Sequence, residues 1–275
     1  MIEPFNIFQS KSILKLWHHN WRSWAFVQNH FLDCFQKLSL PLPENEHCRL
    51  INESSGKYVW RIQQDRVDAA FKLDSGKTPW RYFLKHSLVM REYLNYQRIA
   101  SMGIPVPEVL AVGEFRKCTL LKKSFIVTAF VPGTFDGRSY MPGGEFHDKT
   151  AERMAFAKQN LLWLGKVHEQ QIFHKAFHPR NILCRRKKDG KLEYFWIDLA
   201  RCQRMFAFRM DRAVVQDLHH FFNDMKFTME QAQELVRFYC DHANREYDRV
   251  WHDITHFRRH LIKKKKYCLF GEIKK

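Results

Sequence analysis

The stretch from His174 to Asp198 limits the fold of this chain more than any other part of its sequence. It reads HKAFHPRNILCRRKKDGKLEYFWID, a polar loop followed by an apolar run that ends in an aspartate. In enzymes that transfer a phosphoryl group, such a loop supplies a metal-binding Asn, and an Asp after the next strand completes the metal site. Asn181 and Asp198 stand at that spacing. The stretch therefore predicts a catalytic loop and a metal-binding strand.

The charge balance points to an anionic partner. Lys and Arg number 46 against 29 Asp and Glu, which gives a formal net charge of +17 over 275 residues. Nucleic acid, an acidic membrane surface and a phosphorylated glycan all fit such an excess. No recognised nucleic-acid-reading motif accompanies the charge, so we do not expect nucleic acid as the partner.

The cysteines predict neither a disulfide framework nor a zinc site. There are 7 of them, an odd number, and no pair has the spacing C-x-x-C. Scattered, partly buried thiols in a reducing compartment fit this pattern better.

The first 45 residues read as a helical N-terminal appendage. Ile13, Leu16, Trp17 and Trp24 recur at helix-like spacing. Such a segment either packs on the body of the protein or touches a surface. We expect residues 1–45 to form this appendage.

No targeting or membrane-spanning segment is expected. Glu3 and Pro4 stand where a signal peptide carries its basic region. No window approaches 18 uncharged apolar residues, the length that a spanning helix needs. We therefore expect a cytoplasmic protein, and a peripheral position on a membrane stays open.

Residues 46–133 are expected to form a small β-rich lobe. Its first part has the alternating apolar pattern of strands, and its middle has the spacing of a helix. Its last part is again strand-like and ends in a Pro-Gly break. A strand that breaks into a helical region is typical of a hinge between two lobes. The expected elements are strands at 57–64 and 68–74, a helix at 80–100, a loop and strand at 102–115, and a strand at 124–133.

Within this lobe, a lysine and a glutamate are candidates for an ion pair. Glu92 lies on the apolar face of the predicted helix, where a carboxylate needs a cation. Lys72, on the neighbouring strand, is one candidate for that cation, and Lys85 is the other.

Residues 134–275 are expected to form a mostly helical second lobe with a basic C-terminal tail. Apolar residues recur at helical spacing before and after the catalytic loop. The expected helices run from Ala151 to about Gln171, from Ala213 to Met225, and onward from Thr228 or Glu230.

The order and spacing of several segments resemble the lipopolysaccharide kinase (Kdo/WaaP) family. The resemblance implies an α+β, two-lobed protein-kinase-like fold and an ATP-dependent kinase of a lipopolysaccharide core sugar. It covers roughly residues 57–225. The segments that carry it are AAFKLD, MREYLNYQRIASMGIPVPEVLAVGE, KKSFIVTAFVPG, HKAFHPRNIL, WIDLARCQ and VVQDLHHFF.

The resemblance implies a nucleotide site in the first lobe. Lys72 would contact the α- and β-phosphates of ATP, and Glu92 would be its helix partner. The hinge from Ala129 to Val131 would face the adenine.

It also implies the parts of a catalytic loop in the second lobe. His174 would open the loop, and Asn181 and Asp198 would hold Mg²⁺. Asp217 would brace the loop from the following helix, through hydrogen bonds to loop backbone amides.

One residue departs from the family pattern. Ala176 stands where the pattern has an Asp, and a methyl group can neither accept a proton nor orient a hydroxyl. A positioned base is typically worth about 10²–10⁴-fold in rate, so turnover should be weaker by about that factor if nothing replaces the Asp, while nucleotide and metal binding survive. His178 is either a substitute base or a residue that contacts phosphate or packs the loop. The alternative to an enzyme is a pseudokinase that binds nucleotide or lipopolysaccharide without phosphotransfer.

The basic surface has a natural partner under this resemblance. The family acts on heptose or Kdo of the lipopolysaccharide inner core, so the lipid A-core precursor is the expected substrate. That precursor is built on the cytoplasmic face of the inner membrane. Lys263 to Lys266 in the tail could contact the anionic headgroups of that membrane.

Overall fold

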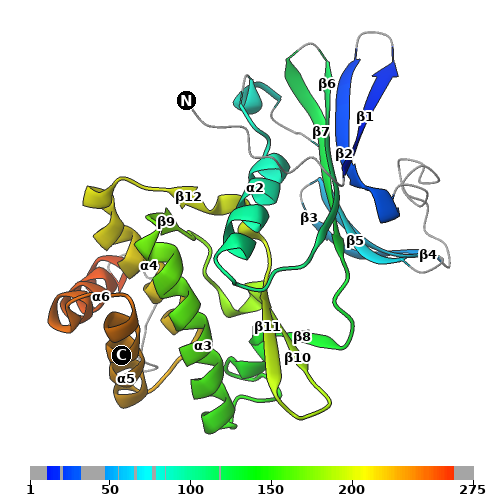
Figure 1. The fold of residues 1–275 in the computed structure, drawn as a ribbon. Coiled ribbons are helices and arrows are strands. Elements are labelled where there is room, and N and C mark those ends of the chain that lie inside the picture. The colour runs from blue at the N-terminus through cyan, green and yellow to red at the C-terminus, as the bar shows by residue number, and fades with distance from the viewer. Residues whose placement is uncertain are drawn as a thin grey trace. The chain divides into compact units, whose positions relative to one another are not determined.

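The chain separates into two compact units in a computed structural model (Figure 1). The first unit comprises Met1–Gln97 and Pro107–Pro132, and the second comprises Arg98–Val106 and Gly133–Lys275. The structure describes residues 11–18, 21–31, 47–54, 56–64, 67–75, 79–83, 85–117 and 119–262. The basic run Lys263–Lys266 therefore lies outside the described residues.

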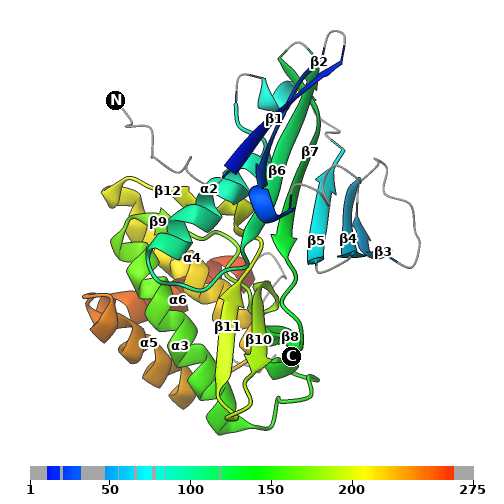
Figure 2. The ribbon, with the colours of Figure 1, turned by 45° about the vertical axis from the view of Figure 1, so that its right-hand side comes forward.

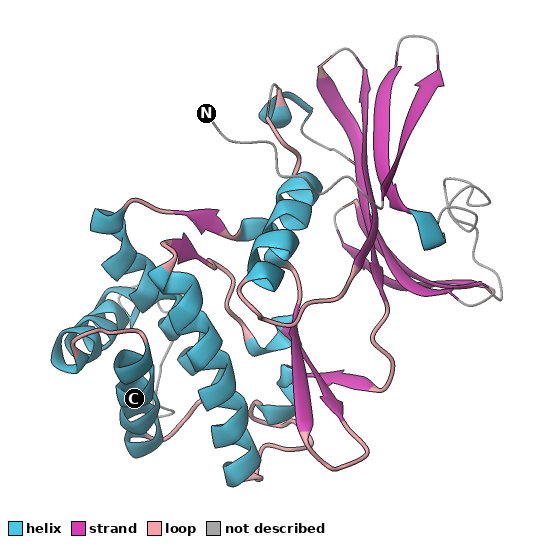
Figure 3. Cartoon of the chain, in the orientation of Figure 1, coloured by secondary structure: helices cyan, strands magenta, loops and turns pink. Residues whose placement is uncertain are grey.

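The first unit is built on an antiparallel sheet, which among the described residues has seven strands in the order β1-β2-β6-β7-β5-β4-β3. A long helix, α2, and short 3-10 turns accompany it (Figure 3). The strands are β1 (Lys11–His18), β2 (Trp21–Gln28), β3 (Cys48–Ser54), β4 (Lys57–Gln64), β5 (Val67–Asp74), β6 (Val109–Lys117) and β7 (Leu120–Ala129). The helical pieces are η2 (Asn29–Phe31), η3 (Pro79–Tyr82) and α2 (Leu88–Ser101).

Strand β5 shows how this sheet divides its two faces. Ala69, Phe71 and Leu73 are buried, and Phe71 stacks on Phe125 of β7 with ring centroids 5.5 Å apart. Side chains alternate along a strand, so Lys72 lies on the opposite face from Phe71 and Leu73. The sequence of β5 therefore puts one lysine on the face opposite the core.

The N-terminal helix predicted for residues 1–45 is wrong where the structure describes that region. β1 and β2 form an antiparallel hairpin, from Lys11↔Gln28 to His18↔Trp21, and β2 continues the sheet by pairing with β6. A few apolar residues in a short segment do not separate the helical period from the strand period. The long-range partner β6 decides for the strand, because its ladder satisfies the backbone groups.

The helix predicted at 80–100 begins later, at Leu88. The Ser87 hydroxyl accepts a hydrogen bond from the Met90 backbone N–H at 3.0 Å, which caps the first turn. Part of the preceding segment is the 3-10 turn η3. The capping residue explains why the helix starts at this point.

The second unit is mostly helical (Figures 2 and 3). Its small strands form a three-stranded sheet in the order β11-β10-β8 and a pair, β12-β9, among the described residues. The helices are α3 (Thr150–Glu169), α4 (Ala207–Met225), α5 (Met229–His242) and α6 (Tyr247–Ile262), with short turns η4 (Gly137–Tyr140), η5 (Pro179–Asn181) and η6 (Leu199–Arg201). The strands are β8 (Thr134–Asp136), β9 (Ile172–Phe173), β10 (Ile182–Arg186), β11 (Leu192–Trp196) and β12 (Gln203–Arg204).

Helix boundaries in this unit follow local chemistry. Thr228 and Gln231 form a reciprocal capping box at the start of α5. This start agrees with the predicted start at Thr228 or Glu230. Helix α4 starts at Ala207, earlier than the predicted Ala213. The prediction missed the first turn because that turn is mostly exposed and lacks the apolar stripe. No helix in the described part of the chain is long and apolar enough to cross a membrane.

Candidate active site

In the first unit, Lys72 and Glu92 form an ion pair. Lys72 Nζ lies 2.9 Å from Glu92 Oε2 and 3.1 Å from Oε1. The Glu92 side chain is 4% exposed and that of Lys72 is 26% exposed. A buried carboxylate of this kind needs its cation, so the pair fixes β5 against α2, while part of the Lys72 side chain stays exposed.

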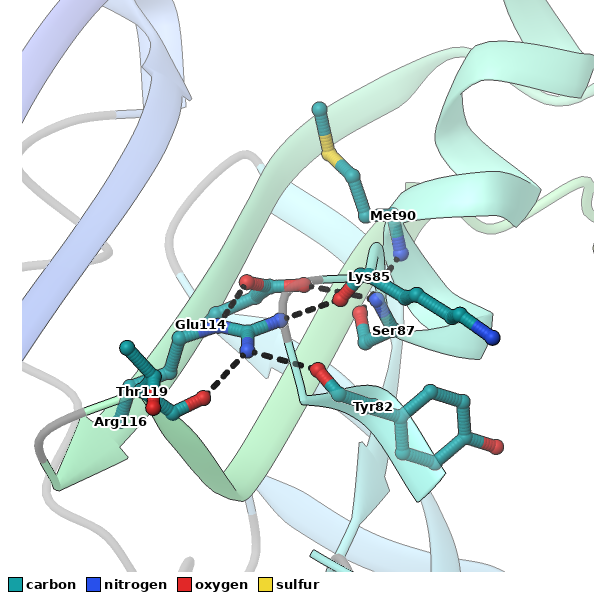
Figure 4. A network of polar contacts seen from close by, with 7 residues as sticks. All are labelled: Tyr82, Lys85, Ser87, Met90, Glu114, Arg116 and Thr119. Atoms are coloured by element: carbon teal, nitrogen blue, oxygen red, sulfur yellow. Dashed lines mark hydrogen bonds and ion pairs between the residues drawn. The ribbon is translucent and has the colours of Figure 1, made fainter. Parts of the chain in front are cut away.

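The start of α2 is held by a second buried carboxylate, Glu114 on β6 (Figure 4). Its Oε1 accepts the backbone N–H of Ser87 at 3.0 Å, and its Oε2 accepts Arg116 Nε at 2.7 Å. Burial by itself would raise the pKa of Glu114, but the hydrogen bonds from Arg116 and Ser87 outweigh that effect and lower it. The carboxylate therefore stays charged, and it ties the capping residue of α2 to the sheet.

The guanidinium of Arg116 extends this support to the segment before α2. It donates to the carbonyl oxygens of Tyr82 at 3.1 Å, Lys85 at 2.9 Å and Thr119 at 3.0 Å. Lys85 thus contributes its backbone to this network, and its side chain is exposed. Of the two candidate lysines, Lys72 is the one that the structure places against Glu92.

Ala129 and Val131 stand at the end of the first unit. The Ala129 N–H donates to the Glu108 carbonyl oxygen at 2.8 Å. Val131 is buried, with 8% of its surface exposed.

In the second unit, Asp217 on α4 holds the start of the loop after β9. Its two carboxylate oxygens accept the backbone N–H groups of His174 and Lys175, each at 2.8 Å. Asp217 is fully buried, and His168 Nε2 lies 3.2 Å from its Oδ2. His168 Nδ1 in turn lies 2.7 Å from the hydroxyl of Tyr239. This buried chain of polar groups joins α3, α4 and α5 to the loop.

The backbone of the loop and of the strand that follows is held in an uncommon conformation at two positions. Lys175 has φ 66° and Asp198 has φ 56°, both in the left-handed region that non-glycine residues rarely adopt. Such conformations persist where surrounding contacts fix them, and they cluster at functional sites. The hydrogen bond from Lys175 N–H to Asp217 is one such contact.

His174 does not reach the surface of the site. Its ring is 2% exposed and lies against Phe177 and Trp196, with centroids 5.3 and 5.2 Å away. Burial lowers its pKa to about 4, although Asp217 and Asp198 oppose the shift, so the ring is neutral near pH 7. His174 was expected among the catalytic residues. In this conformation it packs the loop instead.

Asn181 and Asp198 offer the oxygen ligands that Mg²⁺ prefers. Asn181 Nδ2 donates to the Ala176 carbonyl oxygen at 2.9 Å, which turns its Oδ1 away from that bond. The Asp198 carboxylate does not cap η6, although Asp198 is the capping residue of that turn. One amide oxygen and one carboxylate suit a metal that takes its remaining ligands from water and substrate phosphates. The donor set therefore fits Mg²⁺.

Ala176 is buried, and His178 stands two residues after it along the loop. His178 Nδ1 lies 2.8 Å from Asp224 Oδ2, and the two side chains are 18% and 16% exposed. The His220 ring stacks on the His178 ring with centroids 4.9 Å apart and an angle of 18° between planes. Burial lowers the pKa of His220, and a charge on His178 lowers it further, so a neutral ring supports His178.

Comparison with known proteins decides the family. The family model described as "Lipopolysaccharide kinase (Kdo/WaaP) family" matches residues 49–239, more than half of the chain. The chain belongs to the lipopolysaccharide kinase (Kdo/WaaP) family. The resemblance noted from the sequence is thereby confirmed. No curated protein matches the sequence.

One of two similar solved structures, the first below, shows the fold of this chain. The structure described as "WaaP in complex with acyl carrier protein" is 16% identical, covers 86% of this chain and 91% of its own, and has a TM-score of 0.60. A double mutant of the kinase domain of PknI from Mycobacterium tuberculosis is 15% identical, covers 77% of this chain and 96% of its own, and has a TM-score of 0.46. The predicted α+β kinase-like fold, with a β-rich part and a mostly helical part, is confirmed.

Sequence reasoning missed several residues that support these sites. Asp224 lies two helical turns after Asp217 on α4, a spacing that puts both carboxylates on one face, and this signal could have found it. Glu114 and Arg116 stand two residues apart on β6. Their partners Ser87 and Lys85 come from a distant segment, and no local pattern links that segment to β6. His168 lies within the helix predicted from Ala151 to about Gln171, but its partners Tyr239 and Asp217 come from other helices.

Proposed function

We propose that this member of the lipopolysaccharide kinase family is an ATP-dependent phosphotransferase that acts on an inner-core sugar, heptose or Kdo. Family membership and the kinase-like fold support the reaction class. The observation that favours an active enzyme over a pseudokinase is the contact of 2.8 Å between His178 Nδ1 and Asp224 Oδ2, beside Ala176. We also propose that residues 46–133 and 134–275 act as the two lobes, with β1 and β2 added to the first.

In this proposal the first lobe binds the nucleotide. The Lys72 ammonium group, positioned by Glu92, contacts the α- and β-phosphates. The backbone from Ala129 to Val131 lies against the adenine. The clamp formed by Glu114, Arg116 and Ser87 keeps α2, and therefore Glu92, in place.

The second lobe binds metal and acceptor. Asn181 Oδ1 and the Asp198 carboxylate are the protein ligands of Mg²⁺, which when bound neutralises charge on the β- and γ-phosphates. Asp217 holds the loop by its backbone. The loop thereby presents Asn181 and His178 together.

His178 supplies the base that Ala176 cannot. The Asp224 carboxylate accepts a hydrogen bond from the Nδ1–H group of His178. The lone pair of Nε2 is then available to accept a proton, as in other His–Asp pairs. Nε2 takes the proton of the acceptor hydroxyl as its oxygen forms a bond to the γ-phosphorus. The bond from that phosphorus to the β–γ bridging oxygen breaks, and ADP leaves.

The alternative is a pseudokinase that binds nucleotide or the lipid A-core precursor and regulates or scaffolds core assembly. It needs the same Lys72, Glu92, Asn181 and Asp198 for nucleotide, and it follows if nothing replaces the base. Either protein would work at the cytoplasmic face of the inner membrane, where the precursor is built. Binding of ATP does not separate the two, but transfer does.

The deciding experiment follows labelled γ-phosphate from ATP into purified core lipopolysaccharide, with Mg²⁺ present. We expect transfer by the native chain and a fall of about 10²–10⁴-fold in His178→Ala. We expect Ala176→Asp to restore much of the lost rate in the His178→Ala background, because it returns a carboxylate to the usual place. Mg·ATP should raise the melting temperature of all three proteins.

Three outcomes would each contradict part of the proposal. Absence of transfer by the native chain, together with transfer by Ala176→Asp, supports the pseudokinase. Absence of any thermal shift with Mg·ATP removes nucleotide binding under both hypotheses. Equal rates for native and His178→Ala chains would leave the kinase in place and remove His178 as its base.

A further inference from the structure

Two phenylalanines stand out on the surface of the second unit, where β12 leads into α4. Phe206 is 72% exposed and Phe208 is 78% exposed, and their rings stack with centroids 5.8 Å apart and 12° between planes. The segment lies at the outer edge of this unit in Figures 1 and 2. Two adjacent exposed aromatic side chains gain nothing for folding, and such apolar surface commonly marks an interaction site.

Phe206 occupies a position where another residue would stabilise helix α4 better. Phe206 is the N-cap of α4 and makes no side-chain capping bond, although Ser, Thr, Asn and Asp are favoured there. The first turn of α4 contains no acidic residue. The positive end of the helix dipole therefore faces outward beside the two rings, where it favours an anion.

Four arginines flank the two phenylalanines in the sequence, and the Arg209 guanidinium lies 5.3 Å from the centroid of the Phe208 ring. The segment 201–212 contains all four arginines and one acidic residue, Asp211. The Asp211 carboxylate is already bound by Arg245 at 2.9 Å and Arg249 at 2.6 Å. The four arginines are exposed, and none forms a salt bridge with another residue in the part of the chain that the structure describes; they are Arg201, Arg204, Arg209 and Arg212.

We propose that these six residues, the arginines with Phe206 and Phe208, form a patch that docks on an anionic lipid bilayer. Phenylalanine rings enter the interfacial region while arginine side chains remain at the headgroup phosphates. Two Phe side chains supply about 300–500 Å² of surface. A stable protein interface needs about 800 Å² per partner. Two inserted rings and a few cations are enough for reversible binding to a bilayer.

The patch is joined to the catalytic loop by backbone pairing. Gln203 pairs with Phe173 and Arg204 with Ile172 in the β12-β9 ladder, and Phe173 directly precedes His174. The first arginine of the patch ends η6, the turn that Asp198 begins. Docking of the patch would therefore hold the proposed acceptor site close to the bilayer surface that carries a lipid-anchored sugar. The docking itself requires no phosphotransfer.

Sedimentation with vesicles tests the patch without nucleotide or lipopolysaccharide. The full chain should bind vesicles of phosphatidylethanolamine and phosphatidylglycerol, and bind vesicles of phosphatidylcholine much more weakly. Phe206→Ser with Phe208→Ser should weaken binding on the order of a hundredfold, from the loss of two buried rings. Arg204→Ala with Arg209→Ala should weaken it by about thirtyfold, at roughly fivefold per charge, and added salt should reduce that difference.

A charge-matched control separates the patch from the general basicity of the chain. Lys187 and Lys188 are exposed at the β10–β11 turn, where no large exposed hydrophobic side chain accompanies them. Lys187→Ala with Lys188→Ala should leave binding within about twofold of native, since these charges lie outside the patch. If the lysine control and the arginine variant lost vesicle affinity equally, binding would not be localised to the patch.

Folding of each variant is checked by its melting temperature. Ser at position 206 is a favoured N-cap, so that variant should melt at or above the native temperature. A folded phenylalanine variant that binds vesicles like the native chain would overturn the proposal. So would a native chain that binds no anionic vesicle, and the patch would then be assigned to a protein partner. Neither result would bear on phosphotransfer, which the transfer assay measures separately.

Discussion

The two side-chain pairs proposed to act in the reaction, one in each unit, are built differently. Lys72 and Glu92 join a strand to a helix, and the Glu92 side chain is 4% exposed. His178 and Asp224 join a loop to a helix, and both side chains keep contact with water at 18% and 16% exposure. The first pair is fixed within the fold of its unit. The second is accessible enough for a proton to enter and leave.

This difference separates two tasks that a kinase site performs. A buried ion pair positions a charge for a ligand that always binds in one way, such as the phosphates of a nucleotide. An accessible His–Asp pair suits a group that exchanges a proton with each acceptor. We therefore expect changes at the first pair to affect nucleotide binding and turnover together, and changes at the second to affect turnover alone.

Apart from removal of the proposed base itself, the largest effect is expected from Lys72→Met. The substitution removes the cation proposed for the α- and β-phosphates, and loss of one such electrostatic contact costs about 10²–10³-fold in turnover. It should also reduce the thermal shift produced by Mg·ATP. Lys85→Met is the matched control, because the exposed Lys85 loses the same charge. If Lys85→Met impaired both readouts and Lys72→Met impaired neither, the lysines would have been assigned the wrong way round.

The local parts of both sites could be predicted from the sequence. The strand that carries Lys72 was predicted at 68–74 and is β5, and the helix before the loop was predicted from Ala151 and is α3. Each depends on a period that repeats within one segment. The prediction that Asn181 and Asp198 hold a metal depends on their spacing along one loop and one strand. Short-range patterns of this kind need no knowledge of the rest of the chain.

The remaining parts depend on contacts between distant segments. Asp224 meets His178 only because α4 packs beside η5, and Glu114 meets Ser87 only because β6 passes the start of α2. The N-terminal strands were mistaken for a helix because their partner β6 lies far along the chain. A sequence pattern contains the period of a segment but not the identity of its neighbour.

Arg116→Met tests how far the Lys72–Glu92 pair depends on the clamp behind it. The Arg116 side chain is 15% exposed and that of Glu114 is 4% exposed, so the change leaves a buried carboxylate without its cation. We expect a loss of about 3 kcal/mol in the free energy of unfolding, measured with urea. Arg138→Met, which removes a largely exposed partner of Asp136, should cost little. Equal losses would mean that the buried clamp is no stronger than a surface pair.

Asp224→Asn tests the second pair with little change of shape. The amide can donate to His178 Nδ1 and so favours the tautomer whose proton sits on Nε2, where it blocks proton acceptance. We expect turnover to fall by about 10²-fold, the lower end of the range for a positioned base. The affinity for Mg·ATP should not change. Glu234→Gln, which alters the surface pair with Lys158, is the control. A fall in nucleotide affinity equal to the fall in turnover would assign Asp224 to loop structure alone.

The smallest effect concerns His174 at the start of the loop, where burial lowers the pKa of the ring from its ordinary value of 6.5 to about 4. The unfolded chain binds a proton there as the pH falls below about 6.5, and the folded chain does not until about pH 4. Stability from this group is therefore complete above about pH 6.5 and is lost toward pH 4. At about pH 5.5 the loss should be about 1 kcal/mol. His174→Leu should reduce the slope of unfolding free energy against pH by up to about 1.4 kcal/mol per unit across this window, measured by urea unfolding. An unchanged slope would mean that the His174 ring is protonated in the folded chain, and the packing against Phe177 and Trp196 would then not describe the protein in solution.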